Sequence, residues 1–320
     1  MMSNRTMLKA RKNKNDEFYT QLRDIENEMR HYREHFKDKI IYMNTDHPDR
    51  SEFWRFFKLQ FNIIKAKRIV STYYSHDGTS FKTVYDGKNE VRTKLHGDGD
   101  FRSEECIDIL KKSDIVVTNP PFSLFREFIE LMVEHEKKFI ILGNSNTIGT
   151  KAMFELIKNQ KVWTGMHYNR PMEFKVPQHY ELKGNSGRVS NGEKFVSVPA
   201  IAWFTNLDYP KRHEDLLLWA SYEGSEHEYP NYDNYDAINV DRVSFIPYDY
   251  EGVMGVPITF IGSWNPEQFE VLGITNSGEE NPGIRLPNTE HGRAVVNGEE
   301  KYFRILIRNK KPRKTLIPED

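Results

Sequence analysis

The chain lacks several features that would each assign it to a class of protein. Its 320 residues include one cysteine, Cys106, which excludes an internal disulfide. The eleven histidines are scattered without the short paired spacings of zinc ligands, so we expect no metal. No apolar run approaches the roughly 18 residues of a membrane span, and the N-terminus is polar and basic. We therefore expect a soluble cytoplasmic protein with no membrane partner, in which Cys106 is a buried, unreactive thiol.

The chain also lacks a strong net charge, because its formal charge is −1 at pH 7. The charges are nevertheless segregated: residues 301–314 hold seven cations and no acid, whereas residues 214–241 hold acids but no lysine or arginine. No acid occurs before Asp16, and the cations there are Arg5, Lys9, Arg11, Lys12 and Lys14. Basic tails suit a polyanion, because each neutralised phosphate releases counterions. A single basic tail more often only keeps a chain soluble.

Helical and strand patterns alternate through the first half of the chain. Leu22, Ile25, Met29 and Tyr32 recur at helical spacing, whereas residues 114–118 are a short β-branched run typical of a buried strand. The expected helices span 21–36, 51–61, 103–112 and 124–136; the expected strands span 39–43, 68–74, 114–118 and 138–142, with a hairpin at 78–89. This alternation predicts an α/β protein with a doubly wound, mostly parallel sheet.

The character of the sequence changes after about residue 165, where turn residues and aromatic residues become frequent. Residues 195–198 and 200–204 alternate as strands, and the strand containing Trp203 is also compatible with the first sheet. Residues 229–250 are rich in tyrosine, with acids among them. We expect a mixed, irregular substrate-recognition region in this part of the chain.

One short segment has the composition of a catalytic loop: Asn119-Pro120-Pro121-Phe122, called here the Asn-Pro-Pro-Phe loop. It follows the predicted strand 114–118, and an open parallel sheet binds ligands at the carboxyl ends of its strands. The prolines stiffen the loop, so that Asn119, through its side-chain oxygen, and Pro120, through its carbonyl, can accept both hydrogens of an amino group. Phe122 can stack on a base flipped out of a duplex. The alternative is an ordinary Asn-Pro turn at a strand end.

Several further segments resemble the EcoRI-type adenine-specific DNA methyltransferases, nearly from end to end. They are residues 15–20, 42–48, 97–101, 114–123, 232–238 and 254–260. The resemblance implies a doubly wound sheet of the S-adenosylmethionine-dependent type, with that molecule as cofactor and double-stranded DNA as substrate. It also implies a modification enzyme of a restriction system that flips one adenine, and it favours a monomer.

The resemblance also carries residue roles. Phe18, Tyr19 and Thr20 match the segment that touches the methionine end of the cofactor. Asp100 matches the acceptor for the adenine amino group of the cofactor, and Phe101 packs beside that ring.

The chain departs from most S-adenosylmethionine enzymes after the first two strands. A glycine-rich loop and a ribose-binding acid are both missing in recognisable form. The loop 44–48 stands in place of the glycine-rich loop, and we expect Asn44 and Asp46 to contact the cofactor.

The charge distribution and the change of sequence character lead us to expect a basic arm (1–14), a catalytic domain (15–208) and a DNA target-recognition region (209–320). We take Arg11, Lys12 and Lys14 as candidate DNA contacts. Asn144 and Asn146 follow the predicted strand 138–142, where they either line a base pocket or form an ordinary polar loop.

Other functions remain open at this stage. Similar loops occur in enzymes that methylate RNA guanine or protein glutamine. A DNA endonuclease would need acids and a lysine around a metal, and Asp49, Glu181 and Lys183 are too far apart in sequence to support one. A DNA-specificity module without activity would not need Asn119.

Overall fold

The computed structural model describes residues 19–75, 77–182, 187–275, 277–278, 281–282, 286–287 and 292–315. The chain divides into two compact units. Of the described residues, those from Tyr19 to Ser145 and Thr164–Leu207 form the first unit, and Asn146–Trp163 and those from Asp208 to Thr315 form the second. Each unit has its own sheet.

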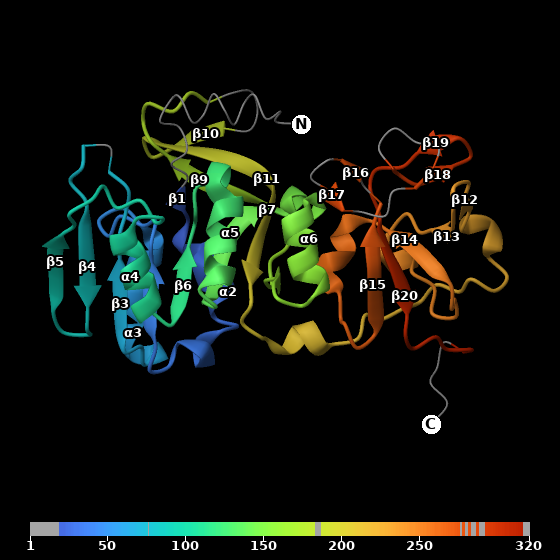
Figure 1. Cartoon of the computed structure of the whole chain (residues 1–320), viewed down its shortest axis with the longest axis horizontal. Helices are drawn as coiled ribbons and strands as arrows, with labels where there is room; N and C mark the ends of the chain where they lie inside the picture. The colour runs from blue at the N-terminus through green and yellow to red at the C-terminus, as the bar shows by residue number, and fades with distance from the viewer. Residues whose placement is uncertain are drawn as a thin grey trace. The chain divides into compact units, whose positions relative to one another are not determined.

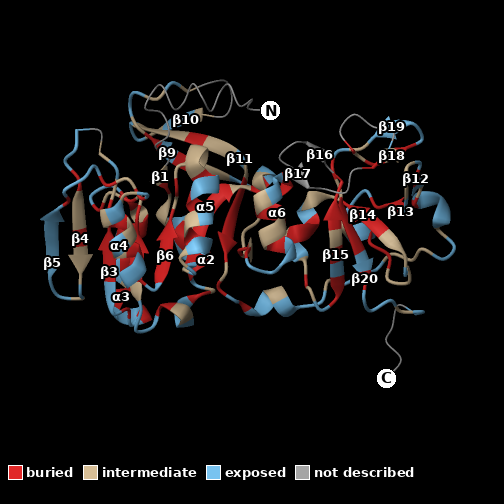
Figure 2. Cartoon of the chain, viewed as in Figure 1, coloured by how far each residue is buried: buried red, intermediate tan, exposed pale blue. Residues whose placement is uncertain are grey.

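The centre of the first unit is a group of parallel strands. β2 (Ile40–Met43), β3 (Arg68–Ser71), β6 (Ile115–Thr118) and β7 (Lys138–Asn144) pair in the order β7-β6-β2-β3. All four residues of β6 are buried, as its β-branched composition predicts. Figure 2 shows this buried centre in red. The predicted α/β class and the four predicted strands are confirmed.

Antiparallel strands flank the parallel centre on one side. β4 (Phe81–Tyr85) pairs with β3, and β5 (Glu90–Lys94) pairs with β4. The turn of this hairpin lies within the expected span 78–89, but its second strand lies beyond that span. At the turn, Gly87 has a φ of 96°, and the Asp86 carboxylate accepts from the amides of Lys88 and Asn89. β5 is exposed along its whole length (Figure 2).

On the other side, β11 (Glu193–Thr205) pairs antiparallel with β7. Beyond it lie β9 (Arg170–Val176) and β1 (Tyr19–Thr20). The Trp203 strand therefore belongs to the first sheet, and residues 195–198 and 200–204 form one strand with an irregularity between Val198 and Ile201. The sheet as a whole is mixed, with parallel pairing at its centre.

Helices pack on opposite faces of β11. Successive side chains of a strand point to opposite faces, and Trp203 contacts Phe53 of one helix while Phe204 contacts Phe125 of another. Figure 1 shows α4 and α5 in front of the sheet. The helices of this unit are α2 (Leu22–Met29), α3 (Glu52–Ile64), α4 (Glu104–Lys112) and α5 (Phe125–Glu134).

Two sequence-based expectations about these helices can be compared with the structure. Ser51 caps α3 by accepting from the amides of Phe53 and Trp54. The helix expected over 21–36 is shorter: α2 ends at Met29, and a 3₁₀ turn (η1) follows at Arg33–Phe36. Cys106 is buried in α4, which confirms the expected buried thiol.

The second unit is built on a five-stranded sheet in the order β12-β13-β14-β20-β15. These strands are β12 (Asn231–Tyr232), β13 (Tyr235–Asn239), β14 (Val253–Val256), β15 (Phe269–Ile274) and β20 (Ile305–Asn309). α6 (Lys151–Lys158) belongs to this unit, and Lys158 Nζ donates to the carbonyl of Leu272 at 2.8 Å. The second unit also has two small two-stranded sheets, formed by β16 (Ser277–Gly278) with β17 (Asn281–Pro282) and by β18 (Val295–Val296) with β19 (Glu299–Glu300). Two further short strands, β8 (Trp163–Thr164) and β10 (Gly187–Ser190), pair with β11 of the first sheet.

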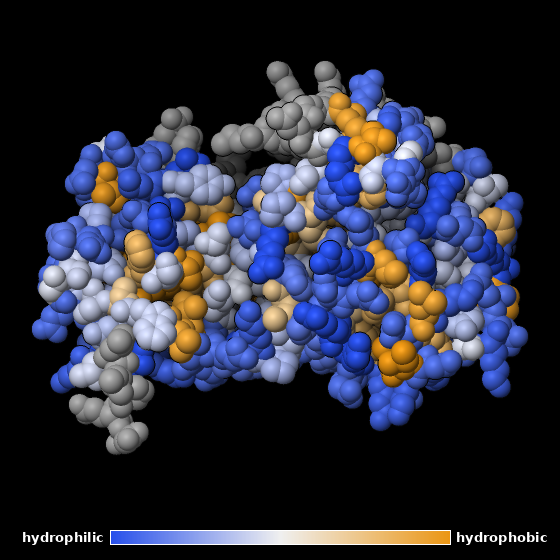
Figure 3. Space-filling view, turned by 180° about the vertical axis from the view of Figure 1, so that it is seen from behind, coloured by the Kyte–Doolittle hydropathy of each residue, from blue (hydrophilic) through white to orange (hydrophobic). Residues whose placement is uncertain are grey.

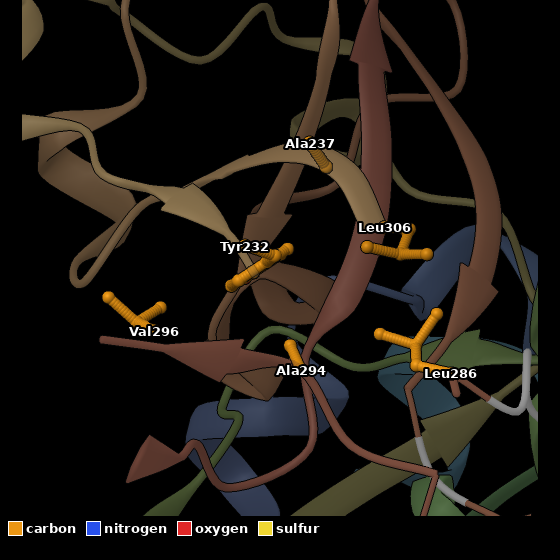
Figure 4. Packing of buried hydrophobic residues seen from close by; sticks show 6 residues of the cluster. All are labelled: Tyr232, Ala237, Leu286, Ala294, Val296 and Leu306. Carbon is orange, nitrogen blue, oxygen red and sulfur yellow. The ribbon is translucent and has the colours of Figure 1, made fainter. Parts of the chain in front are cut away.

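A tyrosine fills part of the core of this unit (Figure 4). The ring of Tyr232 packs with Ala237, Leu286, Val296 and Leu306. A Cβ at Gly255 would lie only 1.9 Å from the Tyr232 hydroxyl oxygen, so glycine at this position gives the ring its space. At least one tyrosine of the 229–250 stretch, Tyr232, therefore serves as a core residue.

The surface carries few large apolar side chains in any one place. Leu59 and Ile63, four positions apart on α3, are 64% and 63% exposed. On the face shown in Figure 3, hydrophobic colour is broken into separate patches among hydrophilic residues. Among the described residues, no helix has the length and apolar character needed to cross a membrane.

A buried carboxylate anchors α2 in the first unit. Glu28 is fully buried and accepts from the Tyr32 hydroxyl, from the amides of Met166 and His167, and from His167 Nδ1 at 2.6 Å. A Cβ at Gly165 would lie 2.3 Å from Glu28 Oε1, so the approach depends on glycine. The side chain of Glu28 thus ties α2 to the segment that precedes β9.

We predict that Glu28→Ala lowers the free energy of unfolding by about 3 kcal/mol, because it removes the acceptor of four buried or half-buried donors. Glu26→Ala on the exposed side of the same helix is the control, and it should change stability by less than about 0.5 kcal/mol. Urea denaturation of both variants measures the difference. Equal stabilities would contradict an anchoring role for Glu28.

Candidate nucleotide and amino-group site

The Asn-Pro-Pro-Phe loop lies directly after β6 and leads through a 3₁₀ turn (η2, Phe122–Leu124) into α5. β2, β6 and β7 are parallel, so the loop shares its edge of the sheet with the residues that follow β2 and β7. Pro120 is buried and Asn119 is half-buried. The Leu124 amide donates to the Pro121 carbonyl at 2.9 Å, which closes the turn after the prolines.

Phe122 points toward the antiparallel side of the sheet. Its ring lies edge-on to the ring of Phe174 in β9, with 6.2 Å between centroids and an interplanar angle of 85°. Phe174 is fully buried, whereas Phe122 is half-buried. An edge-to-face contact of this kind helps to fix the orientation of the Phe122 ring.

Asp46, expected to contact the cofactor, is engaged inside the protein. Its carboxylate accepts from the Ser51 hydroxyl at 2.6 Å and from the Thr118 hydroxyl, and only 8% of the residue is exposed. Burial raises the pKa of Asp46 to about 6, and the two hydroxyl donors oppose that rise. The hydrogen bonds favour an organising role over a direct contact.

Thr45 connects the loop after β2 to the loop after β6. Its hydroxyl contacts the Thr118 hydroxyl and donates to the carbonyl of Asn119 at 3.2 Å. Sequence analysis singled out neither Thr45 nor Thr118, because a threonine at a strand end has no distinctive pattern. Only the pairing of β2 with β6 brings the two residues together.

Two residues of the expected cofactor site carry buried polar atoms. Thr20 Oγ1 and Asn44 Oδ1 are buried and have no hydrogen-bond partner among the described residues. Thr20 lies opposite Phe174 in the register of β1 and β9, and Asn44 directly follows β2. Buried polar atoms of this kind usually have partners, so these two positions fit a polar ligand. Tyr19 is half-buried, and Phe18 lies outside the described residues.

Asp100 and Phe101 lie in the loop before α4. The guanidinium of Arg102 holds the pKa of Asp100 below its usual value, with a 2.6 Å contact between Arg102 Nη2 and Asp100 Oδ2. A carboxylate has about four acceptor positions, so Asp100 can still accept from a ligand amino group. The Phe101 ring is buried against Phe128, with centroids 5.1 Å apart.

The expected DNA contacts are placed unevenly. Asn144 is half-buried at the end of β7, and Asn146 is exposed in a 3₁₀ turn (η3, Ser145–Gly149) that begins at the end of that strand. Arg11, Lys12 and Lys14 lie outside the described residues.

Part of the basic stretch 301–314 is neutralised within the second unit. Four of its cations form ion pairs with acids of that unit, and two of these acids come from the acidic stretch 214–241. The pairs are Lys301–Glu299 at 3.9 Å, Arg304–Asp241 at 3.6 Å, Arg308–Glu270 at 3.4 Å and Lys311–Asp215 at 3.2 Å. The charge segregation in the sequence is therefore partly internal pairing.

A pocket of about 480 Å³ lies between α2 and the strands β9 and β11. Its lining includes His167 and three exposed arginines, Arg23, Arg170 and Arg188, the last of which is paired with Glu173. Arg170, Met172 and Phe174 alternate along β9, so the two lining residues share a face of the strand with the ring that Phe122 contacts. Sequence analysis missed this pocket, because its residues come from four separate segments. The described residues contain no cluster of three or more metal-binding side chains.

Comparison with known proteins places these features in a family. Residues 6–310 match the family described as "Adenine-specific methyltransferase EcoRI". The chain is 45% identical to the Type II methyltransferase M.EcoRI of Escherichia coli, with 98% of each chain covered. It is 38% identical to M.MpnI of Mycoplasma pneumoniae and 37% identical to M.MgeORF184P of Mycoplasma genitalium, both Type II methyltransferases, with 94% of this chain and 97% of theirs covered. No solved structure matches this chain. The chain therefore belongs to the EcoRI-type family of adenine-specific methyltransferases.

Proposed function

We propose that this protein transfers a methyl group from S-adenosylmethionine to the exocyclic amino group of an adenine in double-stranded DNA, as the modification enzyme of a restriction system. The observation that carries the proposal is the position of the Asn-Pro-Pro-Phe loop at the carboxyl end of β6, with Phe122 held beside Phe174. Family membership and the Type II relatives support the substrate and the biological role.

The loop supplies acceptors for an amino group. Asn119 Oδ1 and the Pro120 carbonyl would each accept one amino hydrogen, which leaves the lone pair of the nitrogen free to attack. The stiff prolines keep these acceptors at a fixed spacing. Phe122 would stack on the adenine once it is flipped out of the duplex, which compensates part of the cost of unpairing. A strong base is not required, because alignment of the reacting atoms supplies most of the acceleration.

The cofactor, S-adenosylmethionine, would supply an electrophilic methyl group. Thr20 and Asn44 fit its methionine end, because each has a buried oxygen atom that lacks a hydrogen-bond partner among the described residues. Phe18 and Tyr19 would complete this contact, Asp100 would accept from the adenine amino group of the cofactor, and Phe101 would support the ring. We assign Asp46 to the same site as an organising residue.

We further propose a doubly wound fold of the S-adenosylmethionine-dependent type for residues 15–208 and a DNA target-recognition role for residues 209–320. The packing of α3 and α5 against opposite faces of β11 supports the first assignment. By contacts, residues 146–163 group with the second unit, so the recognition region would include α6 as well. We expect the enzyme to act as a monomer in the cytoplasm, since it treats one strand at a time.

DNA would approach the side of the first unit that holds the pocket between α2 and β9–β11. Arg23 and Arg170 are exposed there, and they suit phosphate groups. Asn144 and Asn146 would contact the target base or its neighbours, and the arm residues Arg11, Lys12 and Lys14 would bind phosphates.

The first test is transfer of labelled methyl from S-adenosylmethionine to unmethylated genomic DNA. We expect methyladenine with the wild-type chain and at least a 100-fold lower rate with Asn119→Ala, because one of two acceptors is lost. Asn62→Ala is the control, since this exposed asparagine lies on α3 and has no role in the proposed site.

Mass spectrometry of the modified base separates the alternatives. Methylation of RNA or protein without methyladenine in DNA would move the enzyme to another substrate class. Full activity of Asn119→Ala on DNA would contradict the assigned role of the loop.

The second test concerns the arm. The triple substitution Arg11→Ala, Lys12→Ala and Lys14→Ala should weaken DNA binding. It should also make the slope of log K against log salt concentration less negative by about 2 to 3, because each lost phosphate contact removes about 0.9 from that slope. Lys37→Ala, Lys39→Ala and Lys67→Ala together are the control, since these exposed lysines lie near the amino ends of β2 and β3. An equal change of slope in both triple variants, measured by fluorescence anisotropy, would argue against a specific role for the arm.

A further inference from the structure

Asp46 joins three segments of the first unit at one buried carboxylate. One carboxylate oxygen accepts from Ser51, the N-cap of α3, and the other accepts from Thr118, the last residue of β6. The backbone of Asp46 is tied to β3 and the residue after it, because its amide donates to the Thr72 carbonyl at 3.0 Å and its carbonyl accepts from the Ser71 hydroxyl. Thr118 is the residue immediately before Asn119.

The hydrogens of this network have a defined direction. The Ser51 oxygen accepts from the amides of Phe53 and Trp54, so its own hydrogen goes to Asp46. The Thr118 hydrogen likewise goes to Asp46, which leaves the Thr118 oxygen as an acceptor. The single Thr45 hydrogen is therefore shared between the Thr118 oxygen and the Asn119 carbonyl. An ionised Asp46 thus sets the donor direction of every hydroxyl up to Asn119.

We propose that Asp46 is a positioning residue, which acts through Thr118 and Thr45 to hold Asn119 in the orientation that binds the amino group of adenine. This inference rests on the proposed function, because it concerns the same reaction. In this role Asp46 does not contact the cofactor directly. Instead, it connects the loop after β2, on the cofactor side, with the loop after β6 that binds the base.

The surroundings of Asp46 explain why the connection uses a carboxylate. Its partners from α3, β3 and β6 are Ser51, Ser71, Thr72 and Thr118, all of them uncharged. A buried charge without a cation is costly, and hydroxyl donors to a carboxylate are stronger than those to a neutral acceptor. A neutral residue could occupy this position at a lower cost, but it would accept less strongly from two hydroxyls at once.

The nearest charged groups along the chain are directed elsewhere. His47 lies 4.0 Å from Asp49 and stacks near Tyr73, and Asp49 is paired with Arg92. The pKa of Asp46 near 6 reflects its burial, with Ser51 and Thr118 as the opposing influences. Protonation of Asp46 therefore removes an acceptor position without compensation from a neighbouring charge.

The central experiment compares Thr118→Val, Thr118→Ser and Thr205→Val in the full-length chain. Thr205 is a matched control, because its buried hydroxyl donates to the Phe139 carbonyl at the end of β11 and takes no part in the site. We expect kcat for DNA methylation to fall about 10- to 100-fold in Thr118→Val, with the KM values for DNA and cofactor changed less than about 3-fold, because the loss is one of alignment. Thr118→Ser keeps the hydroxyl and should restore kcat to within about 3-fold, and Thr205→Val should keep it.

A second readout does not depend on activity. Hydrogen exchange of the amides in residues 122–124 should become faster in Thr118→Val and stay unchanged in Thr205→Val. If the wild-type chain methylates no DNA, the proposed function fails, and this exchange measurement still decides the connection to the loop. Unchanged exchange and unchanged kcat in folded Thr118→Val, or equal losses in the two valine variants, would overturn the inference.

The pH profile tests Asp46 itself. Wild-type kcat should fall as the pH drops through about 6, because the proton taken up by Asp46 turns one of its acceptor oxygens into a donor. Asp46→Asn should have a lower kcat throughout and should lack this acidic limb, since its amide does not titrate in this range. Persistence of the same limb in Asp46→Asn would assign it to another group and contradict the role of Asp46.

Discussion

Parallel pairing of β2 with β6 is the constraint on which the rest of the first unit depends. It brings the ends of two strands to one edge although more than 70 residues separate them in sequence. The Ile41–Ile115 and Tyr42–Val116 register sets Thr45, Asp46 and Thr118 side by side. The hydroxyl and carboxylate contacts at this edge are consequences of that register, because a one-residue slip would turn the side chains to the opposite face.

The antiparallel strands add the features that the parallel centre lacks. β9 and β1 lie beyond β11, and they bring Phe174 and Thr20 to the side of the Asn-Pro-Pro-Phe loop. The Glu28 anchor holds α2 against the start of this region through Met166 and His167. A rigid wall next to a short, proline-stiffened loop is a suitable arrangement for holding a flat ring in one orientation.

The sequence predicted the elements with strong local signals. The β-branched run of β6 and the helix that begins near Ser51 follow from neighbouring residues, and the structure contains both. The loop 119–122 stood out because two consecutive prolines are rare. The Glu28 anchor and the Thr45–Thr118 contact could not be predicted, because each joins residues far apart in the chain and none of these residue types is unusual at its position. Periodicity likewise indicated a strand at Trp203 but did not fix its partner or direction.

The ion pairs of the second unit have a consequence for how this region distinguishes ligands. Arg308 and Lys311 already face carboxylates from Glu270 and Asp215. An incoming phosphate would compete with these carboxylates for the guanidinium and ammonium groups, so the net gain would be smaller than for an unpaired cation. Such an exchange is nearly neutral for a randomly placed phosphate and favourable only where the geometry of the new pair is better. In the recognition role proposed for this region, such a surface would discriminate by the spacing of phosphates and would attract polyanions only weakly.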